Sequence, residues 1–292
     1  MQQYNNYWNL YLKEFPSKGL LYDKEASIRI RPLNVQELKY LTTINEQNCT
    51  DLINEILLKC IILDKIKFED LLISDREYLV YWLRSNSFTN NSGYTMNVSC
   101  EKCGEEYKKE IELTEFPIKY LEDTNNANRT IYLPDSNIQL CLKQPRITDL
   151  RRQFKDIEIE SFLRYIEIDE YNEDILINFL LKLSALDYTI LKNNIEEMYI
   201  GFERIITDYC PKCGEAKQYT IQMTDMGLFG NVSMFEIMEV ILQISKYTNY
   251  QIQDNMPWWE VEAAQAVANK MAEDEKQELE KKDGKVTLYN NK

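Results

Sequence analysis

The 292-residue sequence contains no histidine. This absence excludes the Ser-His-Asp and Cys-His catalytic arrangements, the H-E-x-x-H metalloproteases and every metal site that needs an imidazole ligand. Glycine is also scarce, with 8 residues, and no glycine-rich phosphate loop is present. The nearest match, Gly227-Leu228-Phe229-Gly230, lacks the lysine that follows in a P-loop. The sequence therefore points away from histidine-dependent catalysis and from nucleotide hydrolysis.

Basic residues are also few relative to acidic ones. The sequence has 34 Lys and Arg residues and 48 Asp and Glu residues, which gives a net charge of −14. A chain this acidic is repelled by phosphate backbones unless it carries a local basic patch. One small basic group occurs, but acidic residues follow it at once, which favours a solvated helix face over a nucleic-acid site. The group consists of Lys143, Arg146, Arg151 and Arg152.

Long apolar runs are missing as well, since none reaches the roughly 18 residues that a membrane-spanning helix needs. The polar start, residues 1–5, lacks the basic region and the apolar core of a signal peptide. The seven cysteines are an odd number without the spacing of a disulfide framework, which indicates a reducing compartment. Together these features predict a cytosolic protein without a membrane partner.

Four of the seven cysteines lie in two copies of C-x-x-C-G, within segments 98–104 and 208–214. Two thiolates at this spacing can bind one metal ion, and the glycine lets the backbone turn tightly beneath it. Two such knuckles supply a tetrahedral shell of four sulfur ligands, so we expect one structural zinc ion without an open coordination position. The predicted ligands are Cys100, Cys103, Cys210 and Cys213.

The two halves of this predicted zinc ribbon are separated by 106 residues. The entropy cost of closing a loop grows only logarithmically with its length, so the metal could still hold the two ends of this segment together. Two alternatives stay open, namely two independent disulfides or free thiols in loops. A redox role is not indicated, because neither C-x-x-C lies near a β-α-β pattern. Strands are expected beside the knuckles over 94–99, 107–113 and 218–223.

The hydrophobic pattern predicts a mainly α fold with small β elements, of the α+β class. A helical bundle would accompany the split four-Cys zinc ribbon, which carries a helical insertion. The predicted divisions are an N-terminal extended segment (1–33), a helical bundle (34–93), two zinc-ribbon halves (94–113 and 206–225), a β-hairpin and helical insertion (114–205), C-terminal helices (226–271) and a charged tail (272–292).

Local signals place the individual elements. Capping boxes predict three helix starts, with the pairs Asn34 and Glu37, Ser74 and Glu77, and Ser233 and Glu236. Apolar residues at helical spacing predict helices over 50–63, 173–186, 195–206 and 234–247, and Pro257 suits the start of a final helix. Alternating and turn-flanked patterns predict a strand over 27–31 and a hairpin of 131–133 with 138–142.

No catalytic constellation is evident, because the many carboxylates include no pair that stands out by its spacing. Asp75 and Glu77 lie at a predicted helix start, where acidic side chains interact favourably with the helix dipole. We therefore expect a protein that is not an enzyme and acts through its surfaces. Trp258 and Trp259 open the predicted final helix, which is acidic further along, and they fit a partner-binding anchor, since tryptophan is enriched at interface hot spots. The alternative is that one of them packs in the core.

The order of several short sequences resembles the T-even-type phage baseplate hub or baseplate hub assembly family. The matching pieces span most of residues 15–270 and are Phe15–Gly19, Ile30–Leu33, Asp75-Arg76, Trp82–Ser85, the two knuckles and Met256–Glu260.

This resemblance implies a structural or assembly component of a contractile-tail baseplate, located in the virion tail and assembled in the host cytoplasm. Its partners would be other phage baseplate or tail proteins, or further copies of itself, and its function would be carried by surfaces. A zinc-ribbon protein that binds nucleic acid or acts in transcription is the alternative function. The two differ in the salt dependence of DNA binding, which is steep for the alternative.

Overall fold

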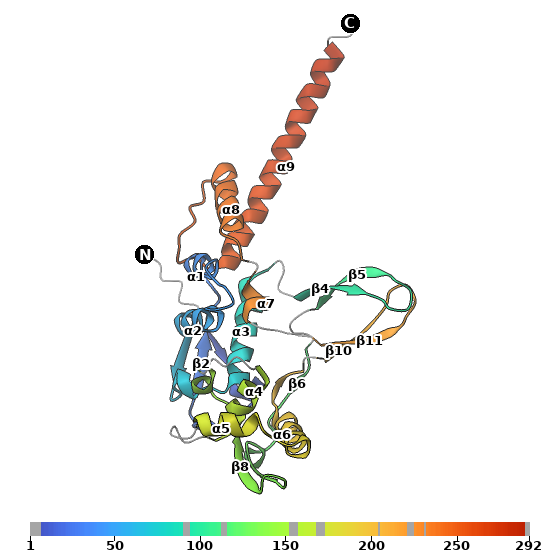
Figure 1. Ribbon diagram of the computed structural model, residues 1–292. Helices are drawn as coiled ribbons and strands as arrows, with labels where there is room; N and C mark the ends of the chain where they lie inside the picture. Colours follow the sequence, from blue (N-terminus) through green and yellow to red (C-terminus); the bar gives the residue numbers. More distant parts are fainter. Residues whose placement is uncertain are drawn as a thin grey trace.

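The computed structural model describes residues 7–89, 94–111, 116–151, 157–167, 173–203, 205–220, 225–230 and 232–289. Over these residues the chain is a mixed α+β protein, as the sequence predicts, with helices that outweigh short strands. Figure 1 shows a body of helices with a small sheet, two β-hairpins that project from one side, and a C-terminal helix that extends away from the body.

The body is built on a three-stranded antiparallel sheet in the order β1 (Trp8–Leu10), β2 (Ser27–Ile30) and β3 (Ile61–Asp64). Exposed and buried residues alternate along β2, so Ile28 and Ile30 are fully buried in the main core. Residues 7–33 therefore share one core with the helical residues that follow them. The helices that contribute to this core include α1 (Val35–Leu41), α2 (Cys49–Cys60) and α3 (Ile73–Ser87).

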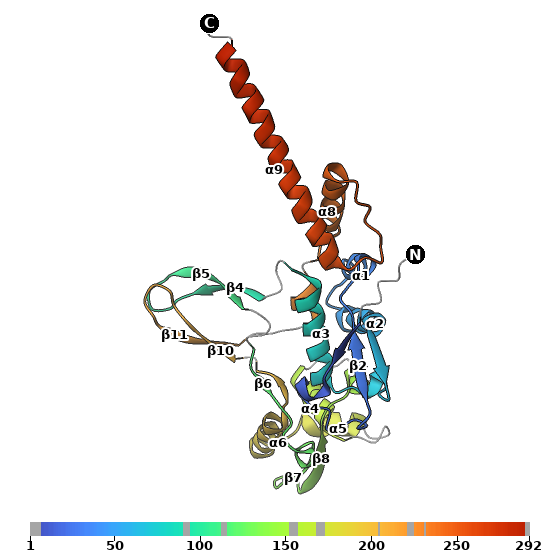
Figure 2. The same cartoon turned by 180° about the vertical axis from the view of Figure 1, so that it is seen from behind.

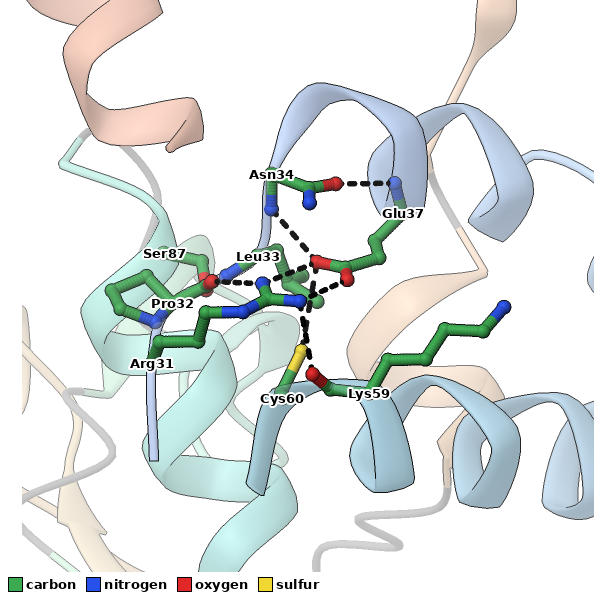
Figure 3. Close-up of polar contacts among 8 residues, drawn as sticks. All are labelled: Arg31, Pro32, Leu33, Asn34, Glu37, Lys59, Cys60 and Ser87. Atoms are coloured by element: carbon green, nitrogen blue, oxygen red, sulfur yellow. Dashed lines mark hydrogen bonds and ion pairs between the residues drawn. The ribbon is translucent and has the colours of Figure 1, made fainter. Parts of the chain in front are cut away.

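A charged cluster fixes the corner where β2 leads into α1 (Figure 3). The Arg31 guanidinium binds both carboxylate oxygens of Glu37, with Nη1–Oε2 and Nη2–Oε1 distances of 2.8 and 2.5 Å. Glu37 Oε2 also accepts from the backbone N–H of Asn34, and the Asn34 side chain accepts from the backbone N–H of Glu37, both at 2.9 Å. This confirms the capping box predicted at Asn34. Burial and the neighbouring Glu37 raise the pKa of the Cys60 thiol, which donates to Glu37 Oε2.

A buried carboxylate fixes the turn at residues 15–19. Asp75 accepts from the backbone N–H of Ser17 at 3.0 Å and from the hydroxyl of Tyr22 at 2.5 Å. Burial raises the pKa of Asp75 from its ordinary value, and these hydrogen bonds oppose the rise. Gly19 has φ of +71°, and a Cβ there would lie 2.8 Å from a leucine side chain, so the turn requires glycine. The acid predicted at the start of α3 therefore ties that helix to the N-terminal segment.

Residues 116–203 form an insertion with a hydrophobic core of its own, in which Leu133 and Leu191 are fully buried. Its two ends lie together, because β6 (Ile118–Lys119) pairs antiparallel with β9 (Gly201–Phe202). The predicted hairpin is confirmed as β7 (Asn128–Leu133) paired with β8 (Ile138–Lys143). The remaining elements of the insertion are α4 (Ile157–Tyr165), α5 (Glu173–Leu180) and α6 (Ala185–Met198), with short 3-10 helices at Thr124–Asn126 and Ile147–Arg151.

Backbone hydrogen bonds hold the insertion against the body. The N–H of Ile73 donates to the carbonyl of Pro145, and the N–H of Ile147 donates to the carbonyl of Leu71, both at 2.9 Å. Two members of the basic group predicted nearby have partners: Lys143 forms an ion pair of 3.0 Å with an aspartate, and Arg146 donates to a backbone carbonyl. Arg152 of that group lies outside the described residues.

Three C-terminal helices complete the chain, α7 (Asp225–Phe229), α8 (Met234–Tyr247) and α9 (Trp258–Tyr289). α9 begins in the main core, packs against α8 and then extends beyond the body, as both views show (Figures 1 and 2). Residues 227–247 have the length and composition of a membrane span, but the structure divides them between α7 and α8. Of the predicted charged tail, residues 290–292 lie outside the described residues.

Several predicted helix boundaries are wrong. α2 ends at Cys60 because residues 61–64 form β3, whose β-branched isoleucines suit a strand as well as a helix. The helix predicted over 173–186 is split into α5 and α6. The helix predicted over 195–206 ends at Met198, where α6 ends and strands follow.

The other two predicted capping boxes are wrong, because neither serine makes the predicted capping hydrogen bond. α3 begins at Ile73 with Leu72 as its N-cap, so Ser74 lies inside the helix and does not cap it. α8 begins where the sequence predicts, after Ser233, but the Ser233 side chain makes no capping hydrogen bond.

Candidate metal centre

Two β-hairpins carry the four predicted metal ligands. β4 (Tyr94–Ser99) pairs with β5 (Glu106–Ile111), and β10 (Ile205–Tyr209) pairs with β11 (Ala216–Thr220), both antiparallel. Each C-x-x-C-G knuckle forms the turn between its two strands. The glycines of the two knuckles have φ of +72° and +70°, a left-handed conformation that glycine adopts without a steric cost.

Three of the four strands that flank the knuckles agree with the prediction, and the fourth differs from it. β4, β5 and β11 match the predicted strands as far as residues 111 and 220, and the ends predicted at 112–113 and 221–223 lie outside the described residues. β10 occupies residues 205–209, where a helix was predicted as far as 206. Isoleucine suits both structures, and the pairing with β11 decides for the strand.

The two turns bring the four sulfur atoms within 4.8 Å of one another. The Sγ atoms of Cys100 and Cys213 are 3.6 Å apart, and those of Cys103 and Cys210 are also 3.6 Å apart. A tetrahedral ion with metal–sulfur distances of about 2.3 Å would separate its sulfur ligands by about 3.8 Å. The cluster therefore has the dimensions of one four-coordinate metal site. It does not fit two disulfides, whose sulfur atoms would be about 2.05 Å apart.

Backbone N–H groups at the first knuckle favour the thiolate form, which is the form that binds a metal. Backbone N–H groups of Cys103 and Lys102 lower the pKa of Cys100 to about 7, against the effect of burial. The N–H of Glu105 favours the Cys103 thiolate too, but burial and the other three sulfurs raise the pKa of Cys103 to about 12. Four thiolates this close repel one another, and a divalent cation among them would remove that repulsion.

The two halves of the site share several local contacts. In each knuckle the glycine N–H donates to the carbonyl of the first cysteine, at 2.8 Å in one and 2.9 Å in the other. Lys102 of the first half pairs with Glu215 of the second at 2.5 Å, and Lys212 pairs with Glu105 at 2.8 Å. These contacts are therefore approximately the same when the two knuckles are exchanged. A lysine of each half pairs with a glutamate of the other half.

A buried carboxylate that sequence reasoning missed links the two hairpins. Asp208 accepts from the Tyr107 hydroxyl at 2.8 Å and forms an ion pair of 3.2 Å with Lys109. Although burial opposes it, hydrogen bonds from Tyr107 and Lys109 keep the pKa of Asp208 below its ordinary value. The only feature of the sequence that could have indicated this role is that Asp208 lies two residues before the predicted ligand Cys210.

A family model described as "T4 bacteriophage base plate protein" matches residues 12–229, which is about three quarters of the chain. The chain belongs to the T4 bacteriophage base plate protein family. The match contains both knuckles, the turn at residues 15–19 and the whole insertion. No curated protein and no solved structure matches the chain.

Membership in the base plate family implies a structural phage protein that assembles with other tail or baseplate proteins. The match ends at residue 229, so α8 and α9 lie beyond the base plate family match. The piece Met256–Glu260, which contributed to the resemblance seen in the sequence, lies in this outer part.

The two tryptophans predicted as a partner-binding anchor have different environments in this base plate protein. Trp258 is 6% exposed and belongs to the main core, and its indole N–H donates to Glu262 at 3.2 Å. Glu262 also accepts from the backbone N–H and the hydroxyl of Thr89, both at 2.6 Å. Trp259 is 37% exposed. Trp258 thus fixes the first turn of α9, and Trp259 is the member of the pair that a partner could reach.

Trp258→Ala is expected to lower the free energy of unfolding by about 3 to 5 kcal/mol, because it leaves a large cavity in the core and removes a donor to Glu262. Trp259→Ala is expected to change it by less than about 1 kcal/mol, since most surface substitutions have small effects. Urea unfolding followed by circular dichroism measures both. Equal effects of the two substitutions would contradict the different environments described above.

Proposed function

We propose that the chain is a non-enzymatic structural or assembly component of a phage contractile-tail baseplate hub, with a fold stabilised by one zinc ion. The observation that carries this proposal is the base plate family match over residues 12–229. The hub is the finer assignment, and it is supported by the order of short sequences that resembles hub proteins. The protein would be assembled into the virion tail in the host cytoplasm.

Zinc is the metal that the donor set favours. Four thiolates in a tetrahedral arrangement suit zinc or iron–sulfur chemistry, and two C-x-x-C-G knuckles at the ends of β-hairpins form the usual zinc ribbon. The residues that would hold the ion are Cys100, Cys103, Cys210 and Cys213. Such a shell has no open coordination position, so the ion would join the two hairpins and would not activate a substrate.

Docking to other baseplate proteins would use the surface at the start of α9. The exposed part of Trp259 is one contact point. Trp258, which is buried in the core, would hold the first turn of α9 in place beneath it. Tryptophan at such contacts often contributes about 2 kcal/mol or more to binding. We therefore retain this pair as the proposed partner-binding residues, with Trp259 as the contacting one.

Quantitative mass spectrometry of purified virions, together with a phage that lacks the gene, tests this function. A hub component should be found in purified virions at a fixed number of copies, and an assembly factor should be absent from them. In either case, deletion should stop the formation of complete tails. Normal, infective tails formed without the protein would contradict a role in the baseplate. Binding of DNA with a steep salt dependence would instead favour the nucleic-acid alternative.

A further inference from the structure

α8 has a second apolar face that nothing in the described chain covers. Ile237 and Ile244 are 3% and 0% exposed and pack in the main core. On the other side of the helix, Phe235 and Leu242 are 76% and 63% exposed. Two methionines extend the same face, and the α8 stripe is defined here as Met234, Phe235, Met238 and Leu242.

The spacing of the stripe is that of a binding face. Phe235, Met238 and Leu242 stand at positions i, i+3 and i+7, so they lie on one side of the helix. The buried pair Ile237 and Ile244 lies on the opposite side, where α8 packs against α9 and the body. Contiguous exposed apolar residues of this kind usually mark an interaction site, and methionines adapt easily to a partner's shape.

The charges around the stripe restrict what can bind there. Residues 232–280 contain ten acidic and three basic residues, a net charge of −7, which is half of the chain's −14. Glu236 and Glu239 are exposed on α8 itself, and within the described residues neither has a hydrogen-bond or ion-pair partner. The single base on α8 is Lys246, in the last turn.

We propose that the α8 stripe binds an amphipathic helix of a partner protein in which lysine or arginine residues flank the apolar side chains. Apolar contacts would supply most of the affinity, as in other helix-in-groove complexes, and the charges would select the partner. A second copy of this chain would bring another −7 to the contact, and a membrane surface rich in anionic lipids would also be repelled. This inference goes beyond the proposed function, which does not depend on it.

Two synthetic 18-residue helical peptides test this surface on the full-length protein. Both carry the same leucine stripe, which is flanked by lysines in one peptide and by glutamates in the other. By isothermal titration calorimetry the lysine peptide should bind with one-to-one stoichiometry and at least about tenfold more tightly than the glutamate peptide, and added salt should weaken it. Equal binding of the two peptides, or binding of neither, would overturn the proposal.

Three variants locate the binding. Phe235→Asp with Leu242→Asp should weaken the lysine peptide at least about tenfold, whereas the matched control Ile175→Asp, which changes a 68% exposed residue of α5, should not weaken it. Glu236→Lys with Glu239→Lys should reduce the preference for the lysine peptide. Unchanged binding in the first variant refutes the site.

Self-association and membrane binding are the competing results. If sedimentation shows a dimer that Phe235→Asp with Leu242→Asp dissociates, a second copy occupies the stripe and the proposal fails. It also fails if phosphatidylglycerol vesicles bind the protein through the same two residues. These outcomes leave the zinc site and the baseplate role unchanged, since both are tested by different measurements.

Discussion

Cys210→Ser is expected to abolish metal binding and to unfold both β-hairpins, while the core of the body stays folded. Structural zinc supplies on the order of 10 kcal/mol to small domains, and a four-thiolate shell loses most of that when one ligand is removed. β4–β5 and β10–β11 are two-stranded sheets, which are only marginally stable by themselves. Elemental analysis should show a fall from about one zinc per chain to almost none. Amide hydrogen exchange in both hairpins should become fast.

Cys141→Ser is the matched control for this experiment. Cys141 is exposed on β8, outside the four-sulfur cluster, so its replacement should leave both the zinc content and the exchange rates unchanged. A strong chelator should reproduce the effect of Cys210→Ser on the unsubstituted protein. Retention of zinc and of slow exchange in the Cys210→Ser protein would show that these cysteines do not form the metal site.

Asp225→Asn is expected to lower the free energy of unfolding by about 3 to 5 kcal/mol. Asp225, at the start of α7, binds Arg76 of α3 through both carboxylate oxygens, with distances of 2.9 and 2.6 Å. The Arg76 side chain is only 4% exposed and the Asp225 side chain 11%. Arg76 Nε also donates to Asn54 at 2.6 Å. Asparagine keeps the shape but removes the charge, so the buried guanidinium loses its counterion.

The exposed pair of Arg129 and Glu197 provides the control. Its N–O distance is 2.6 Å, as in the buried pair, but the glutamate side chain is 66% exposed. Glu197→Gln should therefore cost less than about 1 kcal/mol, because water screens and replaces the interaction. Urea unfolding of both variants gives the comparison. A loss for Asp225→Asn as small as that for Glu197→Gln would show that the Arg76–Asp225 pair does not stabilise the fold.

The metal cluster and one capping box could be predicted because their signals are local. Each C-x-x-C-G knuckle contains two ligands and its own turn within five residues, so only the meeting of the two knuckles had to be inferred. The capping box of Asn34 and Glu37 is likewise complete within four residues. The family resemblance also came from short pieces, and the match over residues 12–229 confirms a base plate protein.

The other features depend on partners that are distant in the sequence. Asp225 and Arg76 are separated by 149 positions, and no pattern near either one indicates the pairing. Residues 61–64 and 205–209 carry isoleucines that fit a helix or a strand, and only the neighbouring strand decides between them. Trp258 and Trp259 are identical in type and adjacent, so their different burial follows from how α9 meets the core.

The two halves of the sulfur cluster leave the ribosome at different times. Cys210 follows Cys100 by 110 positions, and at about 5–20 residues per second it is synthesised about 5–20 s later. During that interval the nascent chain holds only two of the four thiolates of the cluster, while the insertion, which has its own hydrophobic core, is already complete before Cys210 is added. The insertion can therefore fold before the second knuckle arrives, and the order of synthesis makes closure of the four-sulfur site a late event in the maturation of this protein.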